Sequence, residues 1–96
     1  MIIVRNVFQA KYGKGDELVA LFKEARRTWA GNVGMRLLTD LSGPFFTLVA
    51  EFSAASLADW ERLQAQDFAR PEFAEMFART LPLTESGRRE YYTVEE

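Results

Sequence analysis

The sequence contains no cysteine and no histidine among its 96 residues. Without cysteine it forms no disulfide, and it has no thiolate to serve as a nucleophile or as a metal ligand. Without histidine it lacks the commonest general base at neutral pH, the usual haem ligand and the usual nitrogen ligand of zinc or copper. We therefore expect no metal site and no cofactor.

An excess of basic charge is missing as well. The 12 Lys and Arg residues are outnumbered by 14 Asp and Glu, which gives a net charge of -2. Proteins that hold phosphate backbones have a strong positive field, so nucleic acid is not an expected partner. The apolar runs are far shorter than the ~20 residues of a membrane-spanning helix, and the first residues do not form a signal peptide. We expect a cytoplasmic protein with no membrane partner.

The residues that are present are those of a globular protein, since 48% are hydrophobic and 27% are charged. Surface scaling for a chain of this size predicts that about 65% of the unfolded surface is buried on folding. This is enough for one modest core. Residues 1–96 are therefore expected to form a single domain.

The first two predicted elements are a strand and a helix. Residues 2–10 are rich in β-branched and aromatic side chains, as strands are. Residues 16–30 place their apolar side chains at intervals of three and four, which predicts an amphipathic helix that ends at Gly31-Asn32. The side chains of this stripe are Leu18, Leu21, Phe22, Ala25 and Trp29.

Two more strands are predicted at 33–41 and 44–53, joined by a turn at Ser42-Gly43. A two-residue loop pairs Leu37 with Leu48, Met35 with Ala50 and Val33 with Phe52, all on one apolar face. The opposite face then carries Gly34, Arg36, Leu38 and Asp40 beside Phe45, Thr47, Val49 and Glu51. Because a slip of one residue destroys this sorting, the loop must have an even number of residues.

A second helical region begins at Ser56, and Pro71 interrupts it. Its two apolar stripes are Leu57, Trp60, Leu63 and Phe68, with Gln64 on the same side, and then Phe73, Met76, Phe77 and Leu81. Residues 84–87 are expected to turn the chain, and 88–94 to form the last strand. The order β-α-β-β-α-β predicts a ferredoxin-like α+β fold, in which a four-stranded antiparallel sheet carries its helices on one face.

The face of the sheet without helices is mixed in character. An antiparallel sheet that leaves one face in water is polar on that face. Here the face keeps Leu38, Phe45 and Val49, and both faces of strand 2–10 are apolar. We therefore expect a homodimer in which this open face packs on the same face of a second copy.

Three segments carry a resemblance to a known family. They are the opening Ile3-Val4-Arg5-Asn6-Val7-Phe8-Gln9-Ala10-Lys11 with Gly13 and Gly15, the helix start Ser56-Leu57-Ala58-Asp59-Trp60, and Arg70-Pro71-Glu72-Phe73 with the closing Ser86-Gly87-Arg88-Arg89-Glu90. On these the chain resembles the dimeric α+β barrel superfamily, which includes antibiotic-biosynthesis-type monooxygenases, haem-degrading enzymes, haem peroxidases and lactone isomerases. The resemblance implies two sheets packed into a barrel. Without histidine, the cofactor-independent monooxygenases, which hold electron-rich phenols with Asn, Trp, Tyr or Arg, fit best.

Polar side chains on the predicted strands supply the candidate catalytic residues. Asn6 interrupts an apolar strand face, where its amide would orient a phenol oxygen or bond to neighbouring backbone. Arg36, like Arg5, would neutralise an enolate inside the barrel or pair across the sheet with an acid such as Glu51. Glu51 is accordingly either a general base or one member of an ion pair.

Further candidates would hold the ligand. Trp60 would wall an aromatic molecule or pack in the core, and Thr47 lies on the same mixed face as Arg36. Tyr91 and Tyr92 point to opposite faces of the last strand, so only one of them can reach a given pocket. We choose Tyr91 as the candidate.

The sequence thus predicts a homodimer that binds a small apolar or aromatic molecule. One alternative is a cofactor-independent monooxygenase-like enzyme acting on an aromatic or polyketide-type substrate. Another is a structural or interaction dimer without catalysis. Whether the protein is an enzyme is left open by the residues.

Overall fold

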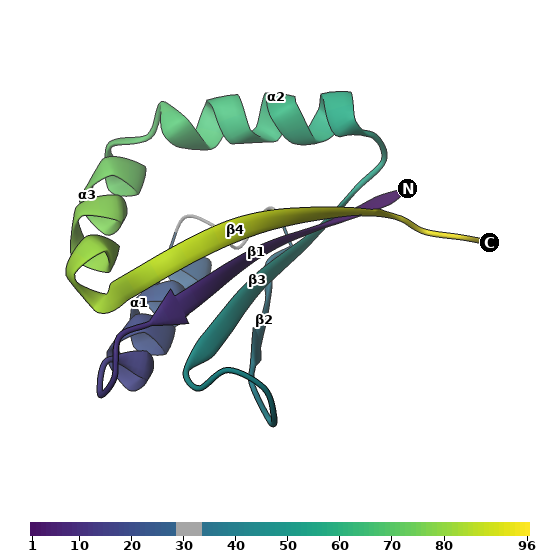
Figure 1. Cartoon of the computed structure of the whole chain (residues 1–96). Helices are drawn as coiled ribbons and strands as arrows, with labels where there is room; N and C mark the ends of the chain where they lie inside the picture. Colours follow the sequence, from purple (N-terminus) through teal and green to yellow (C-terminus); the bar gives the residue numbers. More distant parts are fainter. Residues whose placement is uncertain (29–33) are drawn as a thin grey trace.

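The computed structural model describes residues 1–28 and 34–96, and the elements follow one another as in Figure 1. The strands are β1 (Ile2–Ala10), β2 (Arg36–Thr39), β3 (Thr47–Ala54) and β4 (Thr84–Thr93). The helices are α1 (Gly15–Thr28), α2 (Leu57–Phe68) and α3 (Pro71–Thr80), and a short 3-10 helix, η2 (Leu81–Leu83), leads into β4. The predicted stop at Gly31-Asn32, and Trp29 and Val33, lie outside the described residues.

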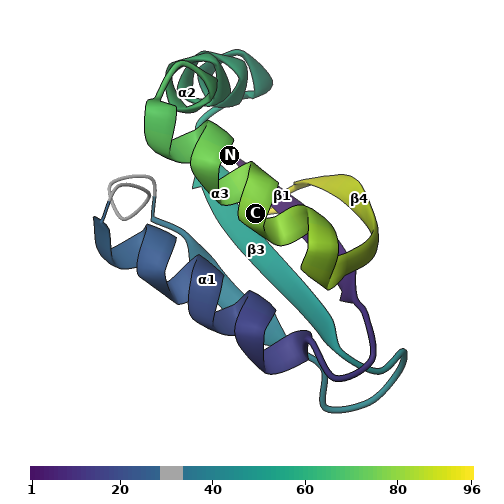
Figure 2. The same ribbon diagram turned by 90° about the vertical axis from the view of Figure 1, so that its left-hand side faces the viewer.

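The four strands form one antiparallel sheet in the order β2-β3-β1-β4. With the helices α1, α2 and α3, this is the predicted ferredoxin-like α+β architecture. Figure 2 shows α1 and α3 crossing the same face of the sheet, with α2 nearly end-on beyond its upper edge. In the described part of the chain, no helix lies on the opposite face. Among the described residues, no helix is both long enough and apolar enough to cross a membrane.

The core lies between α1 and the middle of the sheet. Leu18, Leu21, Phe22 and Ala25 are buried, which confirms the predicted stripe over its described part. Leu18, Phe22 and Ala25 pack against Ala10, Leu48 and Ala50 of the central strands. Burying each large apolar side chain stabilises the fold by about 1.5–3 kcal/mol, so this layer fixes α1 on the sheet.

The hairpin between β2 and β3 has a wider loop than predicted. Leu37 pairs with Ala50, not with Leu48, so the predicted pairings of Leu37 with Leu48 and of Met35 with Ala50 are wrong by two residues. The even parity and the faces it assigns are correct, since Leu37 still lies on the apolar face.

Local chemistry explains the six-residue loop 41–46. Pro44 has no N–H for the ladder, and Phe46 adopts a left-handed φ of 61°. The Asp40 carboxylate accepts from Thr47 N at 2.8 Å, and the Thr47 hydroxyl donates to Pro44 O at 2.8 Å. These bonds close a six-residue loop between Asp40 and Thr47, in place of the predicted two-residue turn at Ser42-Gly43.

The C-terminal third differs from the prediction in one place. Ser56 caps α2 and accepts from Asp59 N, and Pro71 is the first residue of α3. However, residues 84–87 do not turn the chain, because they pair with β1 as the first part of β4. The chain turns earlier, in η2, and a bulge between Gln9 and Ala10 leaves Glu85 as the extra residue of β4.

Candidate functional site

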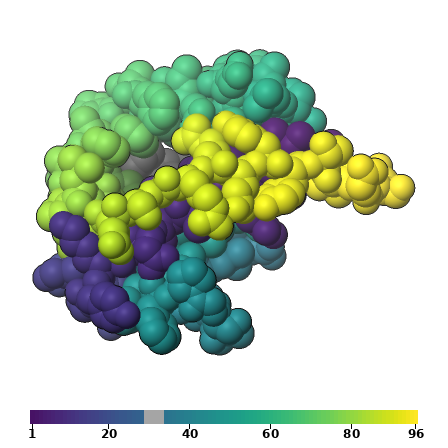
Figure 3. Space-filling model, in the orientation of Figure 1, coloured from purple at the N-terminus to yellow at the C-terminus, as the bar shows by residue number. Residues whose placement is uncertain are grey.

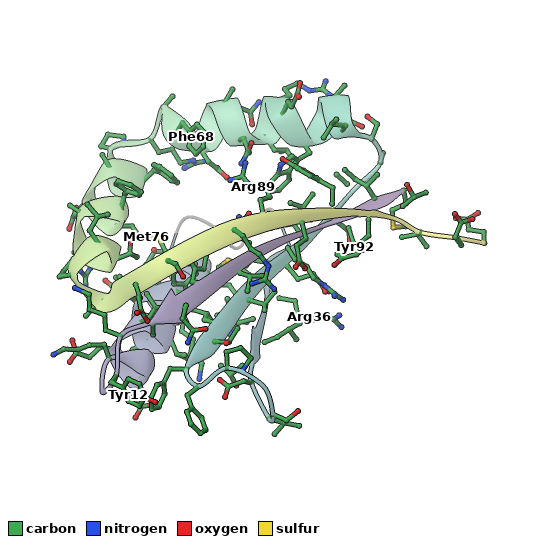
Figure 4. All side chains as sticks on the ribbon, viewed as in Figure 1. Tyr12, Arg36, Phe68, Met76, Arg89 and Tyr92 are labelled. Carbon is green, nitrogen blue, oxygen red and sulfur yellow. The ribbon has the colours of Figure 1, made fainter. Side chains whose placement is uncertain are left out.

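A cavity of about 620 Å³ lies between the helices and the sheet. Ligand pockets in proteins commonly measure about 300–1,000 Å³. Figure 3 shows the hollow between the green helices α2 and α3 and the yellow strand β4. In Figure 4, Phe68 of α2, Met76 of α3 and Arg89 of β4 project into the space that these elements frame. The apolar side chains that border it are Phe8, Phe22, Ala25, Met35, Ala50, Phe52, Trp60, Phe68, Phe73, Met76, Phe77 and Leu81.

The cavity exists because α3 stands away from the sheet. Although α3 has an apolar stripe, none of its residues is buried. Phe68 and Phe77 remain 55% and 54% exposed, and Phe73 lies between them with ring centroids 4.7 Å and 6.4 Å away. These aromatic side chains line a hollow and do not fill a core. The molecule thus leaves apolar surface uncovered on an inward-facing wall.

A glycine keeps the floor of the cavity open. Gly87 of β4 pairs with Phe8 of β1 and borders the cavity. A Cβ atom at Gly87 would meet Phe8 Cδ1 at 3.4 Å, which is ordinary contact. A longer side chain at Gly87 would extend into the cavity.

One wall of the cavity is polar, and Arg89 is its centre. Arg89 Nε donates to Asn6 Oδ1 at 2.7 Å, and these two residues pair directly across β1 and β4. From α2, the Gln64 amide oxygen, turned toward the guanidinium, accepts from both Arg89 Nη atoms at 2.9 Å. Asn6, Gln64 and Arg89 all border the cavity. A cation is thus held at the wall by two neutral amides.

Asp67 is a second polar group of the same wall. Its burial raises the pKa of its carboxyl, and the charge of Arg70 opposes this effect. Arg70 Nε lies 3.7 Å from Asp67 Oδ1. The raised pKa makes Asp67 a better proton acceptor near neutral pH than an ordinary aspartate.

Trp60 is the most deeply buried aromatic residue of the cavity wall. It is 4% exposed and packs on Val4, Ala54 and Phe52, with the Phe52 ring centroid 4.9 Å away. Its Nε1 is buried and has no hydrogen-bond partner among the described residues. Trp60 therefore belongs both to the core and to the wall of the cavity.

The open face of the sheet is organised in rows. Leu38, Val49 and Val7 form an apolar row across β2, β3 and β1. The next row alternates in charge and consists of Arg36, Glu51, Arg5 and Glu90. Figure 4 shows Arg36 and Tyr92 on this side of the sheet, away from the helices.

Glu51 is the buried centre of the charged row. It accepts from Arg5 Nε at 2.8 Å and from Arg36 Nη2 at 2.5 Å, and its side chain is 8% exposed. Burial acts to raise the pKa of Glu51, but the hydrogen bonds from Arg5 and Arg36 and their charges outweigh it and leave the pKa lowered. A carboxylate with a lowered pKa is a poor general base, and the geometry is that of the predicted cross-strand ion pair.

The structure brings Asn6 and Trp60 together at the cavity and places the other candidates elsewhere. Arg36, Glu51 and Thr47 lie on the open face, and the Thr47 hydroxyl closes the hairpin loop. Tyr91 pairs with Val4, is 48% exposed and does not border this cavity.

Tyr91 and Tyr92 point to opposite faces of the sheet, as predicted for neighbouring residues of β4. Tyr92 pairs with Ile3 on the open face, where Arg5 lies over its ring at 5.3 Å. Its hydroxyl donates to Glu90 at 2.9 Å.

Sequence reasoning missed Arg89 and Asp67 as site residues. One signal was present, because Gln64 interrupts an apolar helical stripe in the same way that Asn6 interrupts an apolar strand face. Each of these amides offers an acceptor oxygen, and Arg89 donates to both of them. Among the described residues, no three acidic side chains gather closely enough to hold a metal ion.

Comparison with known proteins gives structural neighbours only. No protein-family model matches the chain, and no curated protein matches it significantly. An uncharacterised NIPSNAP domain protein from Burkholderia xenovorans superimposes with a TM-score of 0.87 at 15% identity, over 99% of this chain and 95% of that one. A NIPSNAP family protein from Agrobacterium tumefaciens gives 0.88 at 18% identity, over 99% and 86%. An antibiotic biosynthesis monooxygenase gives 0.74 at 14% identity, over 100% of both chains.

At these identities the likeness establishes the fold alone. The chain has the ferredoxin-like α+β fold that NIPSNAP and antibiotic biosynthesis monooxygenase-like proteins share. The resemblance seen in the sequence is confirmed at this level.

Proposed function

We propose that the protein binds a small, largely apolar molecule in the cavity between α2, α3 and the sheet. The observation that carries this proposal is the aromatic and methionine lining of a 620 Å³ hollow that the side chains of the described residues do not fill. Uncovered apolar surface on an inward wall gains free energy when a ligand displaces its water, by about 25 cal/mol per Å² of buried apolar area.

Fluorescence titration with the neutral dye N-phenyl-1-naphthylamine tests the proposal. The dye brightens when it leaves water, so the wild-type chain should give a saturable rise. The variant Gly87→Leu, which fills the floor of the cavity, should lose most of the signal, whereas Gly87→Ala, whose Cβ fits at 3.4 Å from Phe8, should keep it. Equal binding by wild type and Gly87→Leu would place the dye elsewhere and end the proposal.

We further propose that the active form is a homodimer built through the open face of the sheet. The apolar row of Leu38, Val49 and Val7 and the alternating charges of the next row make this face suited to a two-fold contact with itself. In sedimentation velocity, the wild type should sediment as a dimer and Val49→Asp as a monomer. Ala20→Asp, on the exposed side of α1, should remain dimeric. A monomeric wild type at micromolar concentration would refute this arrangement.

A second candidate function is oxygenation without a cofactor. It is favoured by the meeting of Asn6, Trp60 and Arg89 at one cavity, because an amide and a guanidinium there would stabilise the anion of an electron-rich phenol. The anion would react with O₂ so that a ring CH₂ becomes C=O and the second oxygen atom leaves as water. Oxygen uptake with anthrone, lost in Asn6→Leu, is the expected result. A binding protein without turnover would show no uptake above the uncatalysed rate.

A further inference from the structure

Arg89 is a cation of the cavity wall whose charge is not paired with a carboxylate among the described residues. Among the described residues, no ion pair joins Arg89 to a carboxylate, and both of its printed partners are neutral amides. The other arginines on the strands differ in this respect. Arg5 and Arg36 share Glu51, and Arg88 bonds to Glu90 at 2.9 Å.

The two amides also fix where the guanidinium points. Arg89 Nε donates to Asn6 Oδ1, and the Gln64 oxygen accepts from both Nη atoms at 2.9 Å. One anchor comes from the sheet and the other from α2, so the guanidinium is held in the gap between them, at the wall of the cavity (Figure 4). Each Nη has two hydrogens, and one acceptor from Gln64 leaves donors for an additional oxyanion.

The acidic residues that border the cavity, Asp67 and Glu85, form no ion pair with Arg89. Asp67 also borders the cavity, but its carboxylate lies 3.7 Å from Arg70 Nε, whose charge lowers the pKa of Asp67 against the effect of burial. Glu85 is the exposed bulge residue of β4, on the stretch that pairs with the end of β1. The charge of Arg89 is therefore available to a ligand.

We propose that the ligand of the cavity is an amphipathic oxyanion, with an apolar body among Phe8, Phe68 and Met76 and a carboxylate-like head bonded to Arg89. This inference rests on the proposed function and adds the chemical class of the ligand. A charged head explains why the wall holds a fixed guanidinium, since planar, two-point recognition of a carboxylate is the particular strength of arginine.

The test compares two isosteric competitors that displace N-phenyl-1-naphthylamine from the cavity. Naphthalene-2-carboxylate carries the negative charge, and naphthalene-2-carboxamide has the same shape without it. For the wild type we expect the carboxylate to displace the dye at a concentration about fivefold or more below that of the amide, which is what a partly exposed charge-assisted hydrogen bond supports. The preference should shrink as salt is raised.

Two variants should abolish the preference by independent routes. Arg89→Gln removes the cation, and Gln64→Glu leaves it in place but supplies an internal carboxylate to pair with it. The control Arg62→Gln removes a cation of α2 that pairs with Asp59 and does not border the cavity, so the preference should stay unchanged.

The outcomes separate this inference from the proposed function. Dye that binds and is displaced equally by both competitors would overturn the anion inference and leave the cavity function standing. A carboxylate preference that persists in both Arg89→Gln and Gln64→Glu would also overturn it. Dye that fails to bind the wild-type cavity would overturn both.

Discussion

Replacing Glu51 with glutamine tests how the charged row of the open face contributes to stability. The substitution keeps the size of the side chain and one acceptor oxygen but removes the charge that Arg5 and Arg36 share. A buried charge-assisted hydrogen bond contributes about 1.5–3 kcal/mol, and an exposed ion pair about 0–1 kcal/mol.

The geometry places the expected loss between these limits. The Glu51 side chain is 8% exposed, but the side chains of Arg5 and Arg36 are 40% and 67% exposed and regain water when the partner charge is lost. We therefore expect Glu51→Gln to lower the free energy of unfolding by about 1–2 kcal/mol at pH 7, or the melting temperature by about 5–10 °C. Urea unfolding at one fixed chain concentration measures the loss. The control Glu24→Gln, whose pairing with Arg79 at 3.2 Å is half exposed, should change stability by less than about 0.5 kcal/mol.

The stability lost in Glu51→Gln should depend on pH, and the lowered pKa of Glu51 sets the direction. Because the folded-state pKa of Glu51 is lowered, its ionisation stabilises the fold fully above the unfolded pKa of about 4.3, and this contribution is lost as the pH falls through the folded value. The gap between wild type and Glu51→Gln should thus be widest above about pH 5 and narrow in more acidic solution. A gap that is absent at pH 7, or that does not change with pH, would refute the reasoning.

Three further substitutions test the fold. Leu18→Ala, at a fully buried position under α1, should lower the free energy of unfolding by about 2–5 kcal/mol in urea titrations, whereas Leu41→Ala in the exposed hairpin loop should leave it unchanged. Ser56→Ala removes the cap of α2 and should lower the free energy of unfolding by about 0.5–2 kcal/mol. The control Ser56→Thr keeps a capping hydroxyl and should stay close to wild type, so an equal loss in both variants would contradict the role of the cap. Gly43→Ala places a Cβ at a φ of 97° and should cost about 1–2 kcal/mol by the same assay, and no loss would contradict the loop conformation.

Sequence periodicity was sufficient for the architecture because both helical and strand patterns report which face is buried. The stripe of α1 and the parity of the β2–β3 hairpin depend only on local spacing, and the structure bears them out. The hairpin register depended on the loop. Its outcome was decided by the left-handed Phe46 and by the hydrogen bonds of Asp40, which periodicity does not report.

The cavity was harder to predict because it depends on apolar side chains of α3 that do not pack against the sheet. An apolar stripe such as that of α3 has the same spacing whether its residues fill a core or line a hollow, and only the placement of α3 distinguishes the two. The polar wall needs residues 83 positions apart, Asn6 and Arg89, to meet across two strands. The predicted strand 88–94 contains Arg89, but its residue pattern does not specify the register that pairs Arg89 with Asn6.

The most direct test of the cavity account is a crystal structure of the protein with naphthalene-2-carboxylate. The account predicts the ring between Phe8, Phe68 and Met76 and a carboxylate oxygen within hydrogen-bond distance of an Arg89 Nη atom. A ring bound on the open face of the sheet, or a carboxylate in the cavity that points away from Arg89 into solvent, would contradict it.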